Sequence, residues 1–517
     1  MTRNPKRPRL TFTVQPETAP GEVLEDLAAL MPSRLLAAAD RERTYFDTFD
    51  WRLYRGGFEL AQTRAGTHGE LRVEPRDGGP PRSARSRGPG FAWDLPEGWL
   101  RELVVPLARM RRLLPRLVLR TRATTLEAID AEAKVVARVV LEEGKACLPE
   151  GEAWPVQTTL RVEPLRGYEP CAAEVARQLA ALPGVVPLKG STLEVGLRAV
   201  GWWPGDDPSS PASDLHPRMR ADQATRAVLR RYLGVIEANE DGVLRDLDSE
   251  FLHDFRVATR RSRSIVGQMG DLLDPESVAA GADGLAWLGS VTGPLRDLDV
   301  FLLRFREEEL DPALGPLQQH LSRTRQRERR RLLRALRSPR YTELKRSWLR
   351  ELDTDTQRAD PPADASRAIR TVARERIARR FERVLRRGAK IDAGTPARKV
   401  HRLRIQCKKL RYLIDAFGPL FEPEGTRALL KRLKRLQDTL GTFNDYEVQI
   451  ELLEHLAGEM KGDTPESARA LLAMGRWQER MRADMVVERE RFARRFARFA
   501  ADKGVDALVP REDDVGA

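Results

Sequence analysis

The chain has 517 residues, of which 41% are hydrophobic, so it is too long for a single compact core and too apolar for general disorder. No apolar run approaches the roughly 20 residues that span a bilayer. Three scattered cysteines, Cys147, Cys171 and Cys407, offer neither a disulfide framework nor a metal-ligand spacing. We therefore expect two or three domains in a reducing, cytoplasmic location, without a membrane partner.

Residues 1–203 alternate short apolar stretches with turn signals, as in "RLTFTVQ", "ERTYFDTF", "FELAQTR" and "LVLRTRAT". This pattern predicts the strands of an antiparallel sheet or barrel, with helices at 20–31 and 169–182. The stretch "RDGGPPRSARSRGPG" (76–90) predicts a loop. The stretch "PGDDPSSPASDLHP" predicts a linker over 204–217.

Residues 218–509 contain helix formers in place of the strand pattern, and prolines and glycines stand mostly at segment ends. The predicted fold class is therefore an α+β multidomain chain with an all-α C-terminal domain. We expect helices near 218–239, 249–272, 277–292, 295–336, 340–351, 364–389, 396–416, 424–440, 442–458 and 466–501.

The net charge of +13 lies mostly in this helical part. Residues 1–217 contain 30 basic and 29 acidic residues, whereas residues 218–517 contain 60 basic and 48 acidic residues, a net charge of +12. If the chain binds a polyanion, the C-terminal part is where we expect it to bind.

One block of the helical part occurs twice. "HDFRVATRRSR" (253–263) and "HRLRIQCKKLR" (401–411) share their basic spacing at an offset of 148 residues, and "TGPLRDLDV" (292–300) and "LGTFNDYEV" (440–448) keep that offset. Self-similarity in one register predicts two copies of one helical unit. The corresponding pairs include Gly293 and Gly441, Asp297 and Asp445, Val300 and Val448, and Arg226 and Arg374.

Each copy places basic residues along one side of a helix. At 100° per residue, positions i, i+3, i+7 and i+10 fall in a stripe about 80° wide, roughly 15 Å long. The stripes are His253, Arg256, Arg260 and Arg263 in the first copy and His401, Arg404, Lys408 and Arg411 in the second; Arg261 and Lys409 also recur.

Like charges at this spacing destabilise a helix by a few tenths of a kcal/mol per pair. A linear polyanion would offset that repulsion, and a protonated histidine would donate two hydrogen bonds to it. The alternative is that acidic side chains elsewhere in the fold, such as Asp297 and Asp445, neutralise two surface helices.

The paired motifs, each followed by a G-x-x-[RN]-D-x-[DE]-V turn, resemble the conserved histidine α-helical domain (CHAD) family from Arg218 to near Val509. The resemblance implies an all-helical domain of two pseudo-symmetric four-helix units around a basic channel. It also implies binding of inorganic polyphosphate and association with polyphosphate granules. The expected polyphosphate-binding residues are His253, Arg256, Arg260, Arg261, Arg263, His401, Arg404, Lys408, Lys409, Arg411, Arg226 and Arg374.

The N-terminal residues resemble the CYTH family of triphosphate-tunnel β-barrels, in "TYFDTFDWRLYRGGFELAQTR" (44–64), 120–144 and 158–167. Tunnel enzymes of that family open with a Glu-x-Glu-x-Lys strand and contain a later Glu-x-Glu strand. This chain has Thr11, Thr13 and Gln15 at the first motif and Arg161 and Glu163 at the second. Hard divalent ions need several carboxylate oxygens, so we expect a barrel without catalytic residues, metal or cofactor.

Two other functions stay open. The chain could be an active, metal-dependent triphosphatase with the helical domain as an accessory. A basic helical domain can also bind nucleic acid through backbone charge. The stripes, however, have no aromatic stacking residue except Tyr412 at their edge, and no helix-turn-helix or zinc motif is present, so nucleic acid is not the expected partner. No oligomeric state is predicted.

Overall fold

The computed structural model describes residues 10–65, 68–86, 88–149, 151–204, 215–307, 310–353, 362–392, 394–460 and 462–501. The chain divides into two compact units, Met1–Asp207 and Pro208–Ala517, which are treated separately below. Residues 205–214 of the predicted linker and the predicted end of the helical domain, 502–509, lie outside the described residues. In the described ranges, no helix combines the length and apolarity that crossing a membrane would require.

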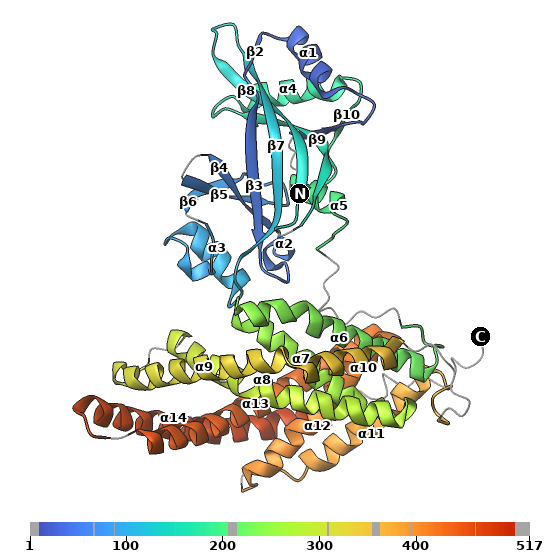
Figure 1. The fold of residues 1–517 in the computed structure, drawn as a ribbon, viewed down its shortest axis with the longest axis vertical. Coiled ribbons are helices and arrows are strands. Elements are labelled where there is room, and N and C mark those ends of the chain that lie inside the picture. The colour runs from blue at the N-terminus through green and yellow to red at the C-terminus, as the bar shows by residue number, and fades with distance from the viewer. Residues whose placement is uncertain are drawn as a thin grey trace. The chain divides into compact units, whose positions relative to one another are not determined.

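The N-terminal unit is built on one ten-stranded antiparallel sheet (Figure 1). Its strand order is β10-β1-β9-β8-β7-β3-β4-β5-β6, with β2 paired to β7 off this path. The strands are β1 Thr11–Val14, β2 Ser33–Leu35, β3 Ala39–Asp47, β4 Phe58–Ala65, β5 His68–Pro75, β6 Arg82–Ser86, β7 Leu114–Ile129, β8 Val135–Cys147, β9 Ala153–Pro164 and β10 Val185–Pro187.

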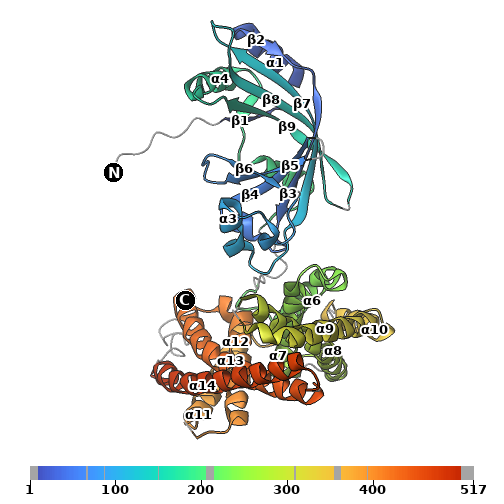
Figure 2. The same ribbon diagram turned by 90° about the vertical axis from the view of Figure 1, so that its left-hand side faces the viewer.

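Helices cover both faces of this sheet. They are α1 Pro20–Leu30, α2 Arg52–Arg55, α3 Trp99–Ala108, α4 Glu169–Ala181 and α5 Thr192–Ala199. Leu27 of α1 and Leu179 of α4 are buried against Phe12 and Leu160 of the sheet. In Figures 1 and 2, α1 and α4 lie toward one end of the long strands β7 and β8, and α3 lies toward the other. Leu193 and Leu197 of α5 pack with Leu117 and Leu119 of β7 on the opposite, concave face.

The expected closed barrel is wrong, because among the described residues β10 and β6, at the two ends of the strand order, do not pair. The sheet is therefore open. Alternation with a period of two identifies a strand and its buried face, but it does not determine which strands end a sheet. The predicted loop 76–90 is also corrected in part, since Arg82–Ser86 forms β6 and pairs with β5.

The C-terminal unit is helical. Its helices are α6 Ala221–Arg245, α7 Ser249–Met269, α8 Pro275–Glu307, α9 Gly315–Leu336, α10 Pro339–Asp353, α11 Ile369–Gly388, α12 Ala397–Phe417, α13 Pro423–Glu459 and α14 Pro465–Ala500. One buried core runs through both copies of the repeat, with Leu229 and Ile265 from the first and Ile377 and Leu410 from the second. A second core joins the far ends of α8, α9, α13 and α14.

Element boundaries in the two copies keep the offset of 148 residues. The starts are Ala221 and Ile369 for α6 and α11, Ser249 and Ala397 for α7 and α12, and Pro275 and Pro423 for α8 and α13. Arg220 and Ala368, at the same offset, form an antiparallel backbone bridge. It is flanked by the hydrogen bonds from Ala221 N to Arg367 O (2.9 Å) and from Ile369 N to Met219 O (2.8 Å). Equivalent positions of the two copies therefore meet at this bridge.

Two expected helix breaks are absent. The predicted gap at 292–295 lies inside α8, which continues through Pro294, and the gap near Gly441 lies inside α13. Proline in a helix interior removes one backbone hydrogen bond. The helix continues because Leu288 and Leu295, on either side of Pro294, are both buried. The single helix predicted over 295–336 is instead divided between α8 and α9.

Candidate functional site

Helices α7 and α12 carry the two basic stripes and contact each other directly. The Asp248 carboxylate caps α7 by accepting hydrogen bonds from the backbone N–H groups of Glu250 (2.9 Å) and Phe251 (3.2 Å). Farther along, the Gln268 side-chain amide of α7 donates to the Lys409 carbonyl of α12 (3.2 Å). The apolar side of each helix is buried in the common core, so their polar sides are fixed relative to each other.

Four cations from the two stripes form a central cluster, which we define as Arg256, Arg260, Arg404 and Lys408. Burial lowers the pKa of Lys408 to about 7, and Arg404, Arg260 and Arg256 lower it further against the opposing effect of Asp445. Burial also lowers the pKa of Arg404, and the Arg260 guanidinium contributes to that shift. The two stripes therefore converge into one electrostatic environment.

Two carboxylates border the central cluster. Asp445 of α13 lies 3.7 Å from the Arg404 guanidinium. Asp297 of α8 is exposed to solvent, yet its carboxylate is partly desolvated, which raises its pKa, while Arg256 and Arg260 act against the shift and Asp445 adds to it. The carboxylates compensate part of the cluster charge, and the four cations exceed them in number.

Buried donor atoms of the cluster lack partners in the described part of the chain. Arg256 donates through one terminal nitrogen to the Gly289 carbonyl (3.2 Å) and the Thr292 hydroxyl (3.0 Å) of α8. The Nε atoms of Arg256, Arg260 and Arg404 are nevertheless buried without a hydrogen bond. Buried donors without a partner are uncommon in proteins and call for a specific explanation.

The two histidines lie one turn before the cluster. His401 is exposed, and its Nδ1 contacts the side-chain oxygen of Asn444 on α13. His253 is half-buried on α7, three residues before Arg256. The Arg263 guanidinium, at the other end of the first stripe, extends along α8 beside Gly289, whose missing side chain leaves room for it.

Several predicted residues lie apart from the central cluster. Arg261 and Arg411 both approach Asp415 at 3.5 Å; the Arg261–Asp415 pair joins α7 to α12, whereas the Arg411–Asp415 pair lies within α12. Arg226 is buried in ion pairs with Asp222 (3.5 Å) and Glu351 (3.4 Å) of its own surroundings.

Lys409 points to another face of α12, next to Arg380 and Arg383 of α11, because consecutive residues are separated by about 100° around a helix. Arg374 is half-buried on α11. Among the described contacts, none joins Arg374 to the central cluster.

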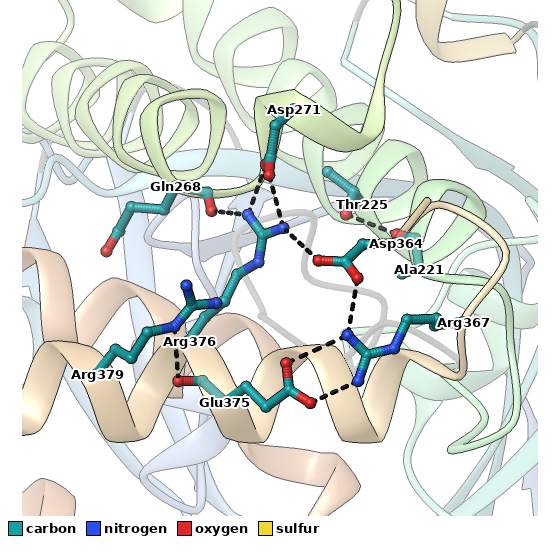
Figure 3. A network of polar contacts seen from close by, with 9 residues as sticks. All are labelled: Ala221, Thr225, Gln268, Asp271, Asp364, Arg367, Glu375, Arg376 and Arg379. Carbon is teal, nitrogen blue, oxygen red and sulfur yellow. Dashed lines mark hydrogen bonds and ion pairs between the residues drawn. The ribbon is translucent and has the colours of Figure 1, made fainter. Parts of the chain in front are cut away.

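A separate polar network fixes α11 beside the end of α7 (Figure 3). The Arg376 guanidinium donates to both carboxylate oxygens of Asp271 (2.6 and 2.8 Å) and lies 3.6 Å from Asp364. Arg367 continues the network to Asp364 (2.7 Å) and Glu375 (3.2 Å). Arg376 therefore has its charge compensated by acids.

In the N-terminal unit, arginines on the concave face pair with glutamates. Arg41 and Arg43 both approach Glu142 (3.7 and 3.6 Å), and Arg161 pairs with Glu163 at 2.8 Å. These glutamates were not singled out by the sequence prediction, apart from Glu163. No group of three or more potential metal ligands occurs among the described residues. At the position of the missing tunnel motif, the Thr13 hydroxyl donates to the Thr158 carbonyl (3.0 Å).

The same face holds a buried carboxylate, Glu59. It accepts a hydrogen bond from the Ser191 hydroxyl (2.6 Å) and lies 3.8 Å from Arg76, which pairs with Glu194 at 2.7 Å. Burial raises the pKa of Glu59 to about 7 despite the Ser191 hydrogen bond, with Glu74 and Glu194 contributing to the rise. The second oxygen of Glu59 has no partner among the described residues.

Comparison with known proteins identifies the helical unit. Residues 227–454 match the family model of the CHAD domain, so the C-terminal unit contains a CHAD domain. Similar solved structures include the CHAD domain from the plant Ricinus communis, which is 27% identical, covers 55% of this chain and 94% of its own, and has a TM-score of 0.47. PptA from Streptomyces chartreusis is 17% identical, covers 55% of this chain and 100% of its own, and has a TM-score of 0.41. No curated protein matches. The CYTH resemblance of the N-terminal unit stays a prediction.

Proposed function

We propose that the CHAD domain binds inorganic polyphosphate at the central cluster, with α7 and α12 on either side of the chain. The observation that carries the proposal is the convergence of Arg256, Arg260, Arg404 and Lys408, with two carboxylates, Asp297 and Asp445, acting on them. Phosphate oxygens would accept hydrogen bonds from these guanidinium groups, which present donors in a planar fork.

The arrangement favours a linear polyanion over a single phosphate. The cations are distributed along two helices, and successive positions on each stripe are separated by about one helical turn of 5.4 Å. A chain of linked phosphates can contact several of them at once. Direct contact with arginine and lysine needs no divalent metal, so binding is expected in the presence of a chelator.

Asp297 and Asp445 fit this proposal as positioning groups. Asp445 approaches Arg404, and Asp297 lies in the field of Arg256 and Arg260. Carboxylates near the cations restrict their conformations before the ligand arrives, which reduces the ordering entropy lost on binding. They also lessen the repulsion within the free cluster.

We further propose that the N-terminal unit has no triphosphatase activity. The support is the pairing of Arg41 and Arg43 with Glu142, and of Arg161 with Glu163, which leaves these guanidinium groups engaged. A phosphate ligand would have to displace glutamates from them. Turnover of triphosphate by the full chain with Mg²⁺ or Mn²⁺ would contradict this proposal.

The test of binding is a titration of the full chain, in chelator, with long-chain polyphosphate, triphosphate, single-stranded RNA and duplex DNA. We expect the tightest binding for long-chain polyphosphate and a steep loss of affinity with added salt, because each neutralised phosphate releases counterions. Equal affinity for RNA or DNA would overturn the assignment to polyphosphate. A protein that binds polyphosphate is also expected to collect at cytoplasmic polyphosphate granules, which fluorescence microscopy of a tagged chain would show.

A further inference from the structure

A second group of cations lies on a different side of α12. We define the outer cluster as Arg380 and Arg383 of α11 and Lys409 of α12. The Arg380 guanidinium donates to the side-chain oxygen of Gln406 on α12 (2.8 Å), which fixes the two helices at this level. Lys409 and Arg380 are half-buried, whereas Arg383 is exposed.

The outer cluster is a site of unrelieved like charge. Burial lowers the pKa of Lys409, and Arg380 and Arg383 lower it further. Burial also lowers the pKa of Arg380, with Arg383 as the second cause. Across the parts of the chain that the structure describes, none of the three forms an ion pair with a carboxylate. Arg376, one turn before Arg380 on α11, pairs with Asp271 and Asp364 (Figure 3).

The other copy of the repeat does not contain this cluster. At an offset of 148 residues, the positions of Arg380, Arg383 and Lys409 correspond to Tyr232, Val235 and Arg261. Arg261 is paired with Asp415 at 3.5 Å. The cluster is therefore specific to the second copy, and the fold of the helical unit does not require three neighbouring cations here.

We propose that the outer cluster is a second phosphate-binding site, which contacts the same polyphosphate chain that occupies the central cluster. The inference rests on the proposed function. Lys408 belongs to the central cluster and Lys409 to the outer cluster, so consecutive residues of one rigid helix carry the two sites. A chain that leaves the central cluster reaches the outer cluster by passing around part of α12.

The consequence is a dependence of affinity on chain length. A helix with its side chains is about 10–12 Å across, so a triphosphate contacts one cluster at a time, whereas a long chain spans both. The second contact is then intramolecular, and its effective concentration raises the affinity without any change at the central cluster. The outer cluster therefore discriminates long polyphosphate from short oligophosphates.

The test compares wild-type full chain with the double variant Arg380→Gln and Arg383→Gln, titrated with long-chain polyphosphate and with triphosphate. We expect affinity for the long chain to fall about tenfold or more, and affinity for triphosphate to change less than about twofold, since the outer contact acts through effective concentration. Removing like charges relieves repulsion and offsets the loss of the Arg380–Gln406 hydrogen bond, so little change in Tm is expected, and such a Tm reports that the variant is folded. The matched control is Arg327→Gln with Arg330→Gln, on an exposed part of α9, which removes the same charge.

The outcomes separate the two proposals. Unchanged affinity of the outer-cluster variant for the long chain overturns the second site while leaving the central cluster in place. An equal loss for triphosphate and long chain also overturns it, because the effect is then on the central cluster. A control that loses as much as the variant shows that net charge alone is responsible. Wild-type chain that binds neither ligand overturns the proposed function and the second site together.

Discussion

Each of the two units contains a group of neighbouring arginines. The two groups differ in the side chains that these arginines contact. On the concave face of the N-terminal sheet, Glu142 receives both Arg41 and Arg43. In the CHAD domain, Arg260 and Lys408 lie among other cations, and the four cations of the central cluster exceed the two carboxylates, Asp297 and Asp445, that act on them. An arginine-rich surface thus becomes a candidate anion site only where its cations exceed the acids within reach.

Reversing charge in the central cluster tests this distinction most strongly. We expect Arg260→Glu combined with Lys408→Glu to lower affinity for long-chain polyphosphate by more than about 100-fold, because each charged hydrogen bond contributes about 1.5–3 kcal/mol. Titration of the full chain measures the loss. The control, Arg327→Glu with Arg330→Glu on α9, changes net charge equally and should cost less than about threefold, since exposed distant charges are screened. A control that costs as much would remove the distinction between the cluster and diffuse charge.

On the N-terminal face, burial of the Glu59 carboxylate should lower the free energy of unfolding when that carboxylate ionises. The folded pKa of Glu59 is about 7 against a usual 4.5, so the ionised form destabilises the folded unit. Its contribution to the free energy of unfolding is largest below pH 4.5, declines as pH rises to about 7, and is constant above that. Glu59→Gln removes this decline and should stabilise the unit by about 3 kcal/mol at pH 8, with little effect at pH 4.

Hydrogen exchange of the β4 amides in the full chain measures that stabilisation. Glu70→Gln, at an exposed position of β5, serves as the control and should leave the pH dependence unchanged. If Glu59→Gln has the same effect at pH 4 and pH 8, the Glu59 carboxylate does not titrate in this range.

Protonation of Lys408 gives a finer test of the central cluster. With a pKa of about 7 in the free protein, Lys408 is largely neutral at pH 8.5. When phosphate binds beside it, the Lys408 amine would have to take up a proton to regain its positive charge. Affinity for long-chain polyphosphate should therefore fall about tenfold between pH 7 and pH 8.5. Lys408→Arg keeps its charge, as Arg260 does at the equivalent position, and should flatten this dependence.

The control for this experiment is Lys345→Arg on α10, where the ammonium pairs with Glu240 at 2.7 Å. It should keep the wild-type pH dependence. A wild-type affinity that is constant between pH 6.5 and pH 8.5 would show that Lys408 does not contact the ligand.

The smallest expected effect comes from unpairing arginines on the N-terminal face. Glu142→Gln leaves Arg41 and Arg43 without their carboxylate and should raise triphosphate affinity a few-fold, because an anion then no longer has to displace that carboxylate from the two guanidinium groups. The background is the Arg260→Glu and Lys408→Glu variant, which removes central-cluster binding from the titration. Glu143→Gln, exposed on the same strand, is the matched control. No gain from Glu142→Gln would show that pairing is not what prevents anion binding there.

Sequence periodicity predicted which helices carry the site residues better than it predicted which other residues these side chains contact. Helical spacing correctly assigned His253–Arg263 and His401–Arg411 to single helices, and the offset of 148 residues recurs in the helix boundaries. The same spacing shows why Lys409 diverges from Lys408, since neighbours on a helix are about 100° apart. Arg226 could not be assigned in this way, because its partner Glu351 is 125 residues away in sequence and only the tertiary fold brings them together.

The N-terminal sheet illustrates the same limit. Strand alternation identified most of the strands, but the strand order that leaves β10 and β6 unpaired depends on long-range pairing. Glu142 and Glu74 belong to strands far apart in sequence from Arg43 and Arg161, and their pairing follows from the register of the sheet. The sequence alone therefore showed that residues 11–15 contain no glutamate. It could not show which acidic residues the arginines of this unit contact.

The backbone bridge between Arg220 and Ala368 has a consequence for how the chain acquires its structure during translation. Met219 and Ala221 leave the ribosome well before Arg367 and Ile369, the residues with which they form hydrogen bonds. At about 5–20 residues per second, the earlier segment waits roughly 7–30 s for its partner to be synthesised. The start of α6 thus cannot form these backbone hydrogen bonds until the whole first copy and the beginning of the second have been synthesised.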